Sequence, residues 1–414
     1  MMKTRKVLTI AMTMALTLSM LSGCGTKSTS QTTGQSTQKV NLRFASWDSD
    51  DTLAMQQKLV DKFNSENPDI KVTLEGYGND YDTKIAAGIG ANDAPDIMYM
   101  WNYPQYGGAL EPMDSYIEKE GQAYKDNFYE TLWNYNSLNG KVLGMPVGYT
   151  THVVYYNKAL FDKAGVAYPK DGWTWQELKD TAKKLTDKNK KVYGFAFSGK
   201  PDPYDFEMYL WSNGTQYVGK DGKIDGNLNS TKAIETLNMF QGMEKDGIAI
   251  ASEKSGLDEM KSGNAAMFIN GSWSLSTLKD AGINYGVVTL PSFEQGKKSI
   301  SIVSSSGVSI SKTSKNKDAA WKFVKYWTSE EANKARIGYE IPVLKSVAKS
   351  QNLLTDSTYS KFYTMLDQSK DYTSSSFKYN KWSELSDKLS LVFEQVFNSS
   401  SYKDPKAALD GAVK

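Results

Sequence analysis

The chain has 414 residues, and its composition excludes several classes of protein. The length is enough for two or three domains. Apolar residues make up 40% and charged residues 23%, which excludes a disordered protein. Three of the 49 basic residues lie within the first six, so the remaining 46 are balanced by 47 acidic residues. The sequence has no basic run or stripe, and we therefore expect no nucleic acid among its partners.

Reactive side chains are scarce. The chain contains one cysteine, Cys24, and one histidine, His152. A structural zinc site usually takes four Cys or His ligands, so we expect no metal site, and one cysteine cannot form a disulfide within the chain. Nucleophilic catalysis would have to use His152, which precedes a predicted strand and is interpreted as a hydrogen-bonded polar residue. We predict no catalytic residue and no cofactor.

The N-terminus has the pattern of an export signal. Residues 1–6 are basic, and residues 7–21 form an apolar stretch of roughly 22 Å as a helix, too short for a hydrocarbon core of about 30 Å. The next residues, Leu21-Ser22-Gly23-Cys24, resemble the bacterial lipobox, in which cleavage occurs before a cysteine that becomes lipidated. The alternative is an ordinary signal that is cleaved elsewhere. We predict a lipoprotein signal peptide at residues 1–23.

Residues 24–39 are rich in Gly, Ser, Thr and Gln and have no apolar anchor, so they are predicted to be a flexible tether. The expected location is the outer face of the cell membrane. There the chain would be held by the lipid on Cys24, including palmitate, and by no membrane span.

From residue 40 onward, the hydrophobic pattern alternates between strand and helix. Residues 40–46 alternate apolar and polar side chains as a strand does, and residues 50–64 carry an apolar stripe with helical spacing. A second strand is predicted at residues 70–74, a helix at 82–89 and a buried strand at 97–100. This β-α-β-α order predicts an α/β protein whose sheet is largely parallel.

The same alternation continues to the C-terminus without an internal repeat of fixed period. Further strands are predicted at residues 153–156, 193–197, 265–269, 285–290 and 300–310. Helices are predicted at residues 174–187, 319–327, 329–337, 384–397 and 404–414. The first of these helices opens with Thr174-Trp175-Gln176-Glu177, which is a capping box.

Five short motifs resemble one family. They are Tyr156-Asn157-Lys158 with Leu160-Phe161, Trp173-Thr174-Trp175 with Glu177-Leu178, Gly263-Asn264-Ala265-Ala266-Met267 with Gly271-Ser272-Trp273, Tyr285-Gly286-Val287, and Glu340-Ile341-Pro342-Val343. In this order they are similar to motifs of the extracellular solute-binding proteins of carbohydrate ABC importers, the maltose-binding-protein-like family 1. The resemblance extends from about residue 40 to about residue 397 and includes the lipobox.

The resemblance implies a two-lobed, type II periplasmic-binding-protein-like α/β fold with a hinge and a cleft between the lobes. The N-lobe would take residues 40–148 and 300–349, and the C-lobe residues 149–299 and 350–414. Ligand would bind in the cleft, and the lobes would close on it by a hinge motion. These lobe boundaries come from the family and not from the periodicity.

The implied function is that of a lipid-anchored substrate-binding subunit of an ABC importer. It would capture a carbohydrate, preferably an oligosaccharide, and deliver it to permease subunits in the membrane. We expect a monomer that performs no catalysis. Two alternatives stay open: a secreted glycoside hydrolase, which needs two suitably spaced carboxylates, and a binder of a non-sugar solute such as a peptide.

Candidate ligand-binding residues follow from the chemistry of a sugar. Aromatic rings can cover its C–H face, and carboxylates or amides can bond its hydroxyls. Trp47 and Asp48 follow the first predicted strand, and Trp101 follows the strand at 97–100, where ligand sites of α/β proteins form. The remaining candidates are Thr150, at the first expected crossing between lobes, Asp202 and Tyr204, in an acidic-Pro-Tyr element that resembles the family's, and Trp273, Glu340 and Trp382.

Some of these candidates have competing structural interpretations. Trp47 could equally be a core residue, and Asp48 could equally cap the helix that follows, instead of contacting a ligand. Trp211 is predicted to lie in the core more readily than in the cleft. Whether Glu207 and Glu340 face the cleft or the core is left open by the sequence.

Overall fold

The computed structural model describes residues 39–398 and 400–414. The predicted signal peptide, Cys24 and the tether as far as residue 38 therefore lie outside the described residues. Within the described part of the chain, no helix combines the length and the apolar character that a membrane crossing requires.

The first sheet has six strands in the order β13-β6-β12-β3-β1-β2. Their bounds are β1 Val40–Ser46, β2 Ile70–Gly76, β3 Ile97–Met100, β6 Met145–Thr151, β12 Val303–Ile310 and β13 Ile341–Pro342. β1 pairs in parallel with β2 and β3, whereas β12 is antiparallel to β3 and β6, and β13 is antiparallel to β6.

The second sheet has five strands in the order β11-β7-β10-β8-β9. They are β7 Val153–Asn157, β8 Phe195–Ser198, β9 Ala249–Ser252, β10 Met267–Asn270 and β11 Tyr285–Val288. β8 is parallel to β9 and β10, and β7 is antiparallel to β10 and β11. A separate hairpin joins β4 Ser137–Leu138 to β5 Lys141–Val142.

The prediction of a largely parallel sheet is wrong, because both sheets are mixed. Within the two sheets, every antiparallel pairing involves β6, β7 or β12. β6 continues into β7 through the single residue His152, so one stretch of chain passes directly from the first sheet to the second. Local periodicity detects strands but carries no information about such a crossing.

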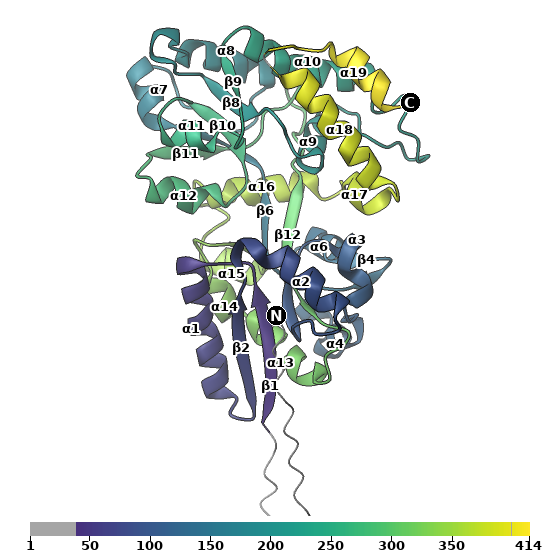
Figure 1. Cartoon of the computed structure of the whole chain (residues 1–414). Helices are drawn as coiled ribbons and strands as arrows, with labels where there is room; N and C mark the ends of the chain where they lie inside the picture. Colours follow the sequence, from purple (N-terminus) through teal and green to yellow (C-terminus); the bar gives the residue numbers. More distant parts are fainter. Residues whose placement is uncertain (1–38, 399) are drawn as a thin grey trace, which may run out of the picture. The chain divides into compact units, whose positions relative to one another are not determined.

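Helices surround each sheet (Figure 1). Those that belong with the first sheet are α1 Asp50–Glu66, α2 Tyr81–Gly90, α3 Tyr103–Tyr106, α4 Asp114–Glu120, α5 Gln122–Asp126, α6 Glu130–Tyr135, α13 Lys317–Trp327, α14 Glu330–Ala335 and α15 Lys345–Ser350. Those that follow strands of the second sheet or pack near it are α7 Lys158–Ala164, α8 Trp175–Leu185, α9 Pro203–Ser212, α10 Thr231–Lys245, α11 Leu257–Lys261, α12 Ser274–Asp280, α16 Tyr359–Ser369, α17 Ser375–Lys378, α18 Trp382–Phe397 and α19 Pro405–Ala412. Short 3₁₀ turns occur at η1 Gly78–Asp80, η2 Gly107–Ala109 and η3 Lys188–Lys190.

The predicted elements are present, with small shifts at their ends. The capping box of α8 is confirmed: the Thr174 hydroxyl accepts from the Glu177 amide, and the Glu177 carboxylate accepts from the Thr174 amide. The strand predicted from residue 193 begins at Phe195, because Tyr193 forms only an isolated bridge to Ala265. The strand predicted from residue 300 begins at Val303.

Aromatic packing supports the end of the first sheet where candidate residues emerge. The Phe44 ring lies 4.8 Å from the ring of Trp327 and 5.1 Å from that of Phe323. The Trp327 indole N–H donates to the Tyr99 hydroxyl at 3.1 Å. The residues that follow β1 and β3 therefore start from a rigid, buried base.

Candidate cleft between the two sheets

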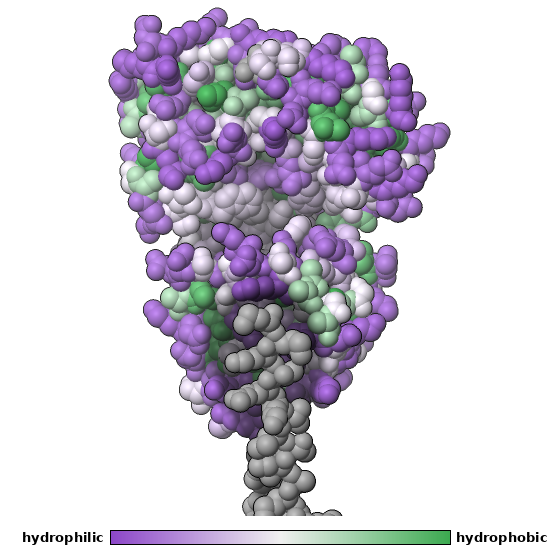
Figure 2. Space-filling model, in the orientation of Figure 1, coloured by the Kyte–Doolittle hydropathy of each residue, from purple (hydrophilic) through white to green (hydrophobic). Residues whose placement is uncertain are grey.

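One large cleft collects the candidate residues. It has a volume of ≈ 930 Å³ and is lined by side chains from elements of both sheets. Figure 2 shows a pale recess of intermediate hydropathy between two mostly hydrophilic regions of the surface. All nine candidates line it: Trp47, Asp48, Trp101, Thr150, Asp202, Tyr204, Trp273, Glu340 and Trp382.

The first-sheet side of the cleft is built at strand ends. β1 and β3 are parallel neighbours, so Trp47, just after β1, and Trp101, just after β3, leave the same edge of the sheet. Trp47 is half-buried, with its ring 5.4 Å from that of Tyr81 and 4.8 Å from that of Tyr99. Trp101 is 45% exposed. Trp47 thus combines a packing role with an open face, whereas Trp101 mainly faces the cleft.

Asp48 is held by polar neighbours and does not cap a helix. Its Oδ2 accepts from Gln56 Nε2 at 2.6 Å and from the Ser46 hydroxyl at 3.2 Å. The N-cap of α1 is Ser49. Burial raises the pKa of the Asp48 carboxyl above its usual value, although both hydrogen bonds oppose the shift.

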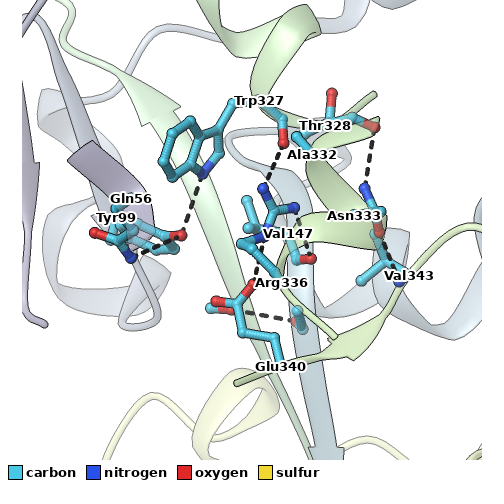
Figure 3. Close-up of polar contacts among 12 residues, drawn as sticks. Gln56, Tyr99, Val147, Trp327, Thr328, Ala332, Asn333, Arg336, Glu340 and Val343 are labelled. Carbon is cyan, nitrogen blue, oxygen red and sulfur yellow. Dashed lines mark hydrogen bonds and ion pairs between the residues drawn. The ribbon is translucent and has the colours of Figure 1, made fainter. Parts of the chain in front are cut away.

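Glu340, half-buried just before β13, forms an ion pair with the buried Arg336 (Figure 3). Arg336 Nε donates to Glu340 Oε2 at 2.8 Å, and another guanidinium nitrogen donates to the Trp327 carbonyl at 2.9 Å. The Arg336 side chain is only 1% exposed. Burial raises the pKa of Glu340, and the Arg336 charge opposes this. The structure therefore places Glu340 at the cleft wall while anchoring it to the core.

The second-sheet side is built at the starts of helices. Asp202 is the N-cap of α9 and accepts from the Tyr204 amide at 2.9 Å. The Tyr204 hydroxyl donates to the Val303 carbonyl of β12 at 2.7 Å, which fixes its ring against the cleft. Trp382 is the first residue of α18 and lies half-buried near Tyr217.

Trp273 projects from the turn between β10 and α12 and is 48% exposed. A Cβ added at Gly271 would overlap the Trp273 ring, so glycine is required for the ring to fold back at this turn. The ring lies nearly perpendicular to that of His152, with ring centroids 5.7 Å apart. The Thr150 hydroxyl of β6 accepts from the Ser272 amide at 2.7 Å and so ties this turn to the first sheet.

Three residues considered at the sequence level lie elsewhere. Glu207 is buried and accepts from the Ser375 amide at 2.8 Å and from the hydroxyls of Ser374 and Ser375. Burial raises its pKa to about 6. Trp211 is buried, as expected, and His152 is buried with its pKa lowered to about 4 by desolvation.

Several lining residues are not among the nine candidates, although Asn102 and Tyr149 adjoin the candidates Trp101 and Thr150 in sequence. These additional lining residues are Thr52, Asn79, Tyr81, Asp82, Asn102, Pro104, Tyr135, Tyr149, Ser272, Ser276, Ser304, Ser305, Ser306, Tyr339, Ser376, Phe377 and Ser386, with Gly78 and Gly148. The serine-rich centre of β12 was a usable signal, because small polar residues inside a strand leave room for a ligand. Tyr135 and Phe377 had no local signal, since their place depends on tertiary contacts.

No group of three or more His, Cys, Asp or Glu residues within residues 39–398 and 400–414 is arranged to hold a metal ion.

Comparisons with known proteins agree on the type of molecule. The family model for bacterial extracellular solute-binding proteins matches residues 46–334. A protein of Brucella abortus (strain 2308), named as a binding protein, is 30% identical over 374 residues, which cover 85% of this chain and 86% of that protein. The sn-glycerol-3-phosphate-binding periplasmic protein UgpB of Escherichia coli (strain K12) is 30% identical over 251 residues, covering 56% of this chain and 57% of UgpB.

A solved structure has the same fold. It is an ABC substrate-binding protein from Listeria monocytogenes in complex with cycloalternan, with a TM-score of 0.77 and 27% identity. The match covers 91% of this chain and 97% of that one. The two-sheet α/β architecture is accordingly the two-lobed, type II fold of periplasmic binding proteins. This chain belongs to the bacterial extracellular solute-binding proteins.

Proposed function

We propose that this chain captures an oligosaccharide in the cleft and delivers it to the permease subunits of an ABC importer. One observation carries the proposal. Of the ten tryptophans, all of which lie in the described part, only four are not buried, and all four line the cleft: Trp47, Trp101, Trp273 and Trp382. The other six are buried.

Open tryptophan faces suit a sugar ring. A pyranose presents a flat C–H surface, and an indole covers such a surface while its N–H bonds to water or a hydroxyl. Exposed aromatic groups gathered in a concave site indicate binding, because isolated exposed apolar rings would be scattered. The cleft volume of ≈ 930 Å³ lies near the upper end of about 300–1,000 Å³ for ligand pockets, which favours several sugar rings over one.

Short polar side chains between the rings would bond to the hydroxyls. Asp48 and Glu340 lie on the first-sheet side and Asp202 on the second, and the serine hydroxyls of β12 lie between them. The complex of the Listeria relative with cycloalternan supports a carbohydrate as the ligand.

Transport requires a change on binding. The proposed moving bodies are the N-lobe, residues 40–148 and 300–349, and the C-lobe, residues 149–299 and 350–414. The strand segments around residue 151 and residue 303 would act as hinges, since β6 and β12 lead from one sheet toward the other. A sugar that touches both sides makes more contacts in the closed form, and this difference drives closure.

The proposed location is outside the cytoplasmic membrane, with a lipid on Cys24 as the only membrane anchor and a monomer as the working form. Cys24→Ala, expressed in the native host, should release the chain from membranes into the medium or periplasm. Retention of the variant in the membrane fraction would contradict the anchor.

The binding proposal is tested by calorimetric titration of the purified protein with neutral oligosaccharides of two to six units. The expected result is saturable binding in the micromolar range or tighter with a raised melting temperature. Binding of peptides and of no sugar would overturn it. Chromatography of the recovered ligand separates binding from the hydrolase alternative, since a binder returns the sugar intact.

A further inference from the structure

The lining of the cleft contains acidic side chains but no basic ones among the described residues. Four carboxylates line it: Asp48, Asp82, Asp202 and Glu340. Within the described part of the chain, no lysine, arginine or histidine is among the lining residues. The body of the protein is electrically balanced, so this excess is local to the cleft.

Only one of the four carboxylates is neutralised. Glu340 is paired with Arg336 at 2.8 Å. Asp48, Asp82 and Asp202 take part in no ion pair among residues 39–398 and 400–414. The cleft therefore presents three carboxylates that no lysine or arginine of the described residues pairs with.

These carboxylates keep acceptor capacity for a ligand. Both protein hydrogen bonds to Asp48 end on Oδ2, which leaves Oδ1 without a protein donor. Asp202 Oδ1 accepts from the Tyr204 amide, and no protein donor reaches Oδ2. Asp82, in the first turn of α2, is exposed. Donors on a ligand, and cationic donors most strongly, would complete these sites.

We propose that the cleft selects its ligand by charge. It accepts neutral oligosaccharides, binds amine-bearing oligosaccharides more tightly, and rejects phosphorylated and uronic-acid sugars. This inference rests on the proposed function, since it assigns a charge class to the same ligand. A ligand ammonium gains carboxylate partners and the faces of Trp101 and Trp273. A phosphate would meet like charges and no lining cation.

This chain should therefore differ in ligand charge from its relative UgpB, whose name gives sn-glycerol 3-phosphate as the ligand. Recognition of a phosphate usually uses Arg, Lys or a helix N-terminus. Helix starts do line this cleft, but Asp202 already caps α9, and the lining holds carboxylates and no lysine or arginine among the described residues.

A ligand-independent experiment tests the charge of the cleft. The four tryptophans that are not buried all line it, so quenching of tryptophan fluorescence reports on it. Each ion's quenching constant is divided by its quenching constant for free indole, which carries no charge. At constant ionic strength, this normalised constant is expected to be at least twofold larger for caesium than for iodide. The triple variant Asp48→Asn, Asp82→Asn, Asp202→Asn should raise iodide quenching at least twofold.

The matched control removes three carboxylates from the exposed surface outside the cleft: Asp69→Asn, Glu118→Gln, Glu235→Gln. It should leave the ratio of caesium to iodide quenching unchanged. Melting curves of both triple variants confirm that they fold. If iodide quenches the wild type as strongly as caesium, or if both triple variants change the ratio equally, the charge inference is overturned.

Titrations then test selection directly. Two pairs of sugars of matched length compare a neutral sugar with one that bears an amine: maltotetraose with acarbose, and the N-acetylglucosamine tetramer with the glucosamine tetramer. Two anionic probes are added, the galacturonate tetramer and glycerol 3-phosphate. The amine-bearing member of a pair that binds should bind at least tenfold tighter, and the cleft triple variant should lose this advantage. The anions should not bind detectably.

The outcomes distinguish the two proposals. An anionic probe that binds as tightly as a neutral sugar, or an amine that gives no advantage, overturns charge selection and leaves sugar binding in place. If no sugar of any charge binds, the proposed function fails, and the quenching ratios still decide the charge of the cleft.

Discussion

The two sides of the cleft hold their functional side chains by different means. On the first-sheet side, Asp48 and Glu340 are fixed by partly buried polar contacts, just after β1 and just before β13. On the second-sheet side, Asp202, Trp273 and Trp382 stand at or just before the first residue of a helix. A change at Asp48 or Glu340 should therefore disturb folding as well as binding, whereas a change at Trp273 should act mainly on the ligand.

The two sides should also respond oppositely to acid. Burial raises the pKa values of Asp48 and Glu340, so the folded state holds these protons more tightly than the unfolded state does. Burial lowers the pKa of His152, beneath Trp273, to about 4, so the folded state holds this proton less tightly. As the pH falls, the two carboxyls favour folding and the histidine opposes it.

The largest expected effect is the loss of Arg336. Arg336→Met leaves the half-buried Glu340 without its cation and the Trp327 carbonyl without its donor, and we expect the free energy of unfolding to fall by about 3 kcal/mol. Chemical denaturation measures the loss, and adding Glu340→Gln should recover part of it. The control is Lys334→Met, which breaks an exposed pair with Glu330 and should cost less than about 1 kcal/mol. Equal losses in the two single variants would show that the pair of Arg336 and Glu340 has no special role.

The next effect is the pH dependence of His152. Because the folded state holds the His152 proton less tightly, the native state is not destabilised by this group above its unfolded pKa of 6.5, and it loses stability as the pH falls toward 4. The expected loss in the free energy of unfolding is about 3 kcal/mol, at 1.36 kcal/mol per pKa unit. Unfolding of wild type and His152→Gln, followed from pH 7 to pH 4, should show a flatter profile in the variant.

Asp48→Asn should change the pH dependence of stability in the opposite direction to His152→Gln. It removes a group that favours folding as the pH falls, so wild type should gain stability relative to this variant on acidification. Parallel profiles for wild type and His152→Gln would contradict the assignment of His152 as a neutral buried residue.

A smaller effect is expected at Trp273. Trp273→Ala should weaken sugar binding by about 2 kcal/mol, or roughly thirtyfold, because it removes an open stacking face. Its melting temperature without ligand should change little, since the side chain is 48% exposed. Trp47→Ala should reduce both affinity and stability, because Trp47 also packs on Tyr81 and Tyr99. Calorimetric titration and melting of both variants make the comparison, and early melting of Trp273→Ala would identify a core residue.

The smallest effect concerns the cap of α9. Asp202→Ala removes the acceptor for the Tyr204 amide and should lower the free energy of unfolding by about 1 kcal/mol. Asp202→Asn keeps a good cap and should leave stability unchanged while removing one cleft charge. Denaturation of both variants checks this, and an equal loss in both would mean that the carboxylate charge stabilises the fold.

Much of the fold was predictable because its signals are local. The strands at residues 40–46 and 97–100 and the capping box at Thr174 follow from side-chain spacing and are present in the structure. All nine candidate residues line one cleft, since strand ends and helix starts in an α/β protein gather at the same edge. Their roles toward a ligand stay predictions.

The direction of the strands and the complete set of residues that line the cleft could not be predicted from local sequence patterns. β6, β7 and β12 run antiparallel to their neighbours because the chain crosses between sheets, which periodicity cannot show. Tyr135 and Phe377 come together, with ring centroids 5.0 Å apart, from positions far apart in the sequence.

The sequence by itself determined the family, the individual strands and helices and the aromatic character of the site, because spacing and residue type act over a few positions. The tertiary structure alone decided which charges remain unpaired. The pair of Arg336 and Glu340 is local, four residues apart, whereas Asp48, Asp82 and Asp202 come from distant parts of the sequence and meet at one cleft without a cation partner among the described residues. The charge of the cleft is therefore a product of folding, since a carboxylate is neutralised only when the fold brings a cation within a few ångströms of it.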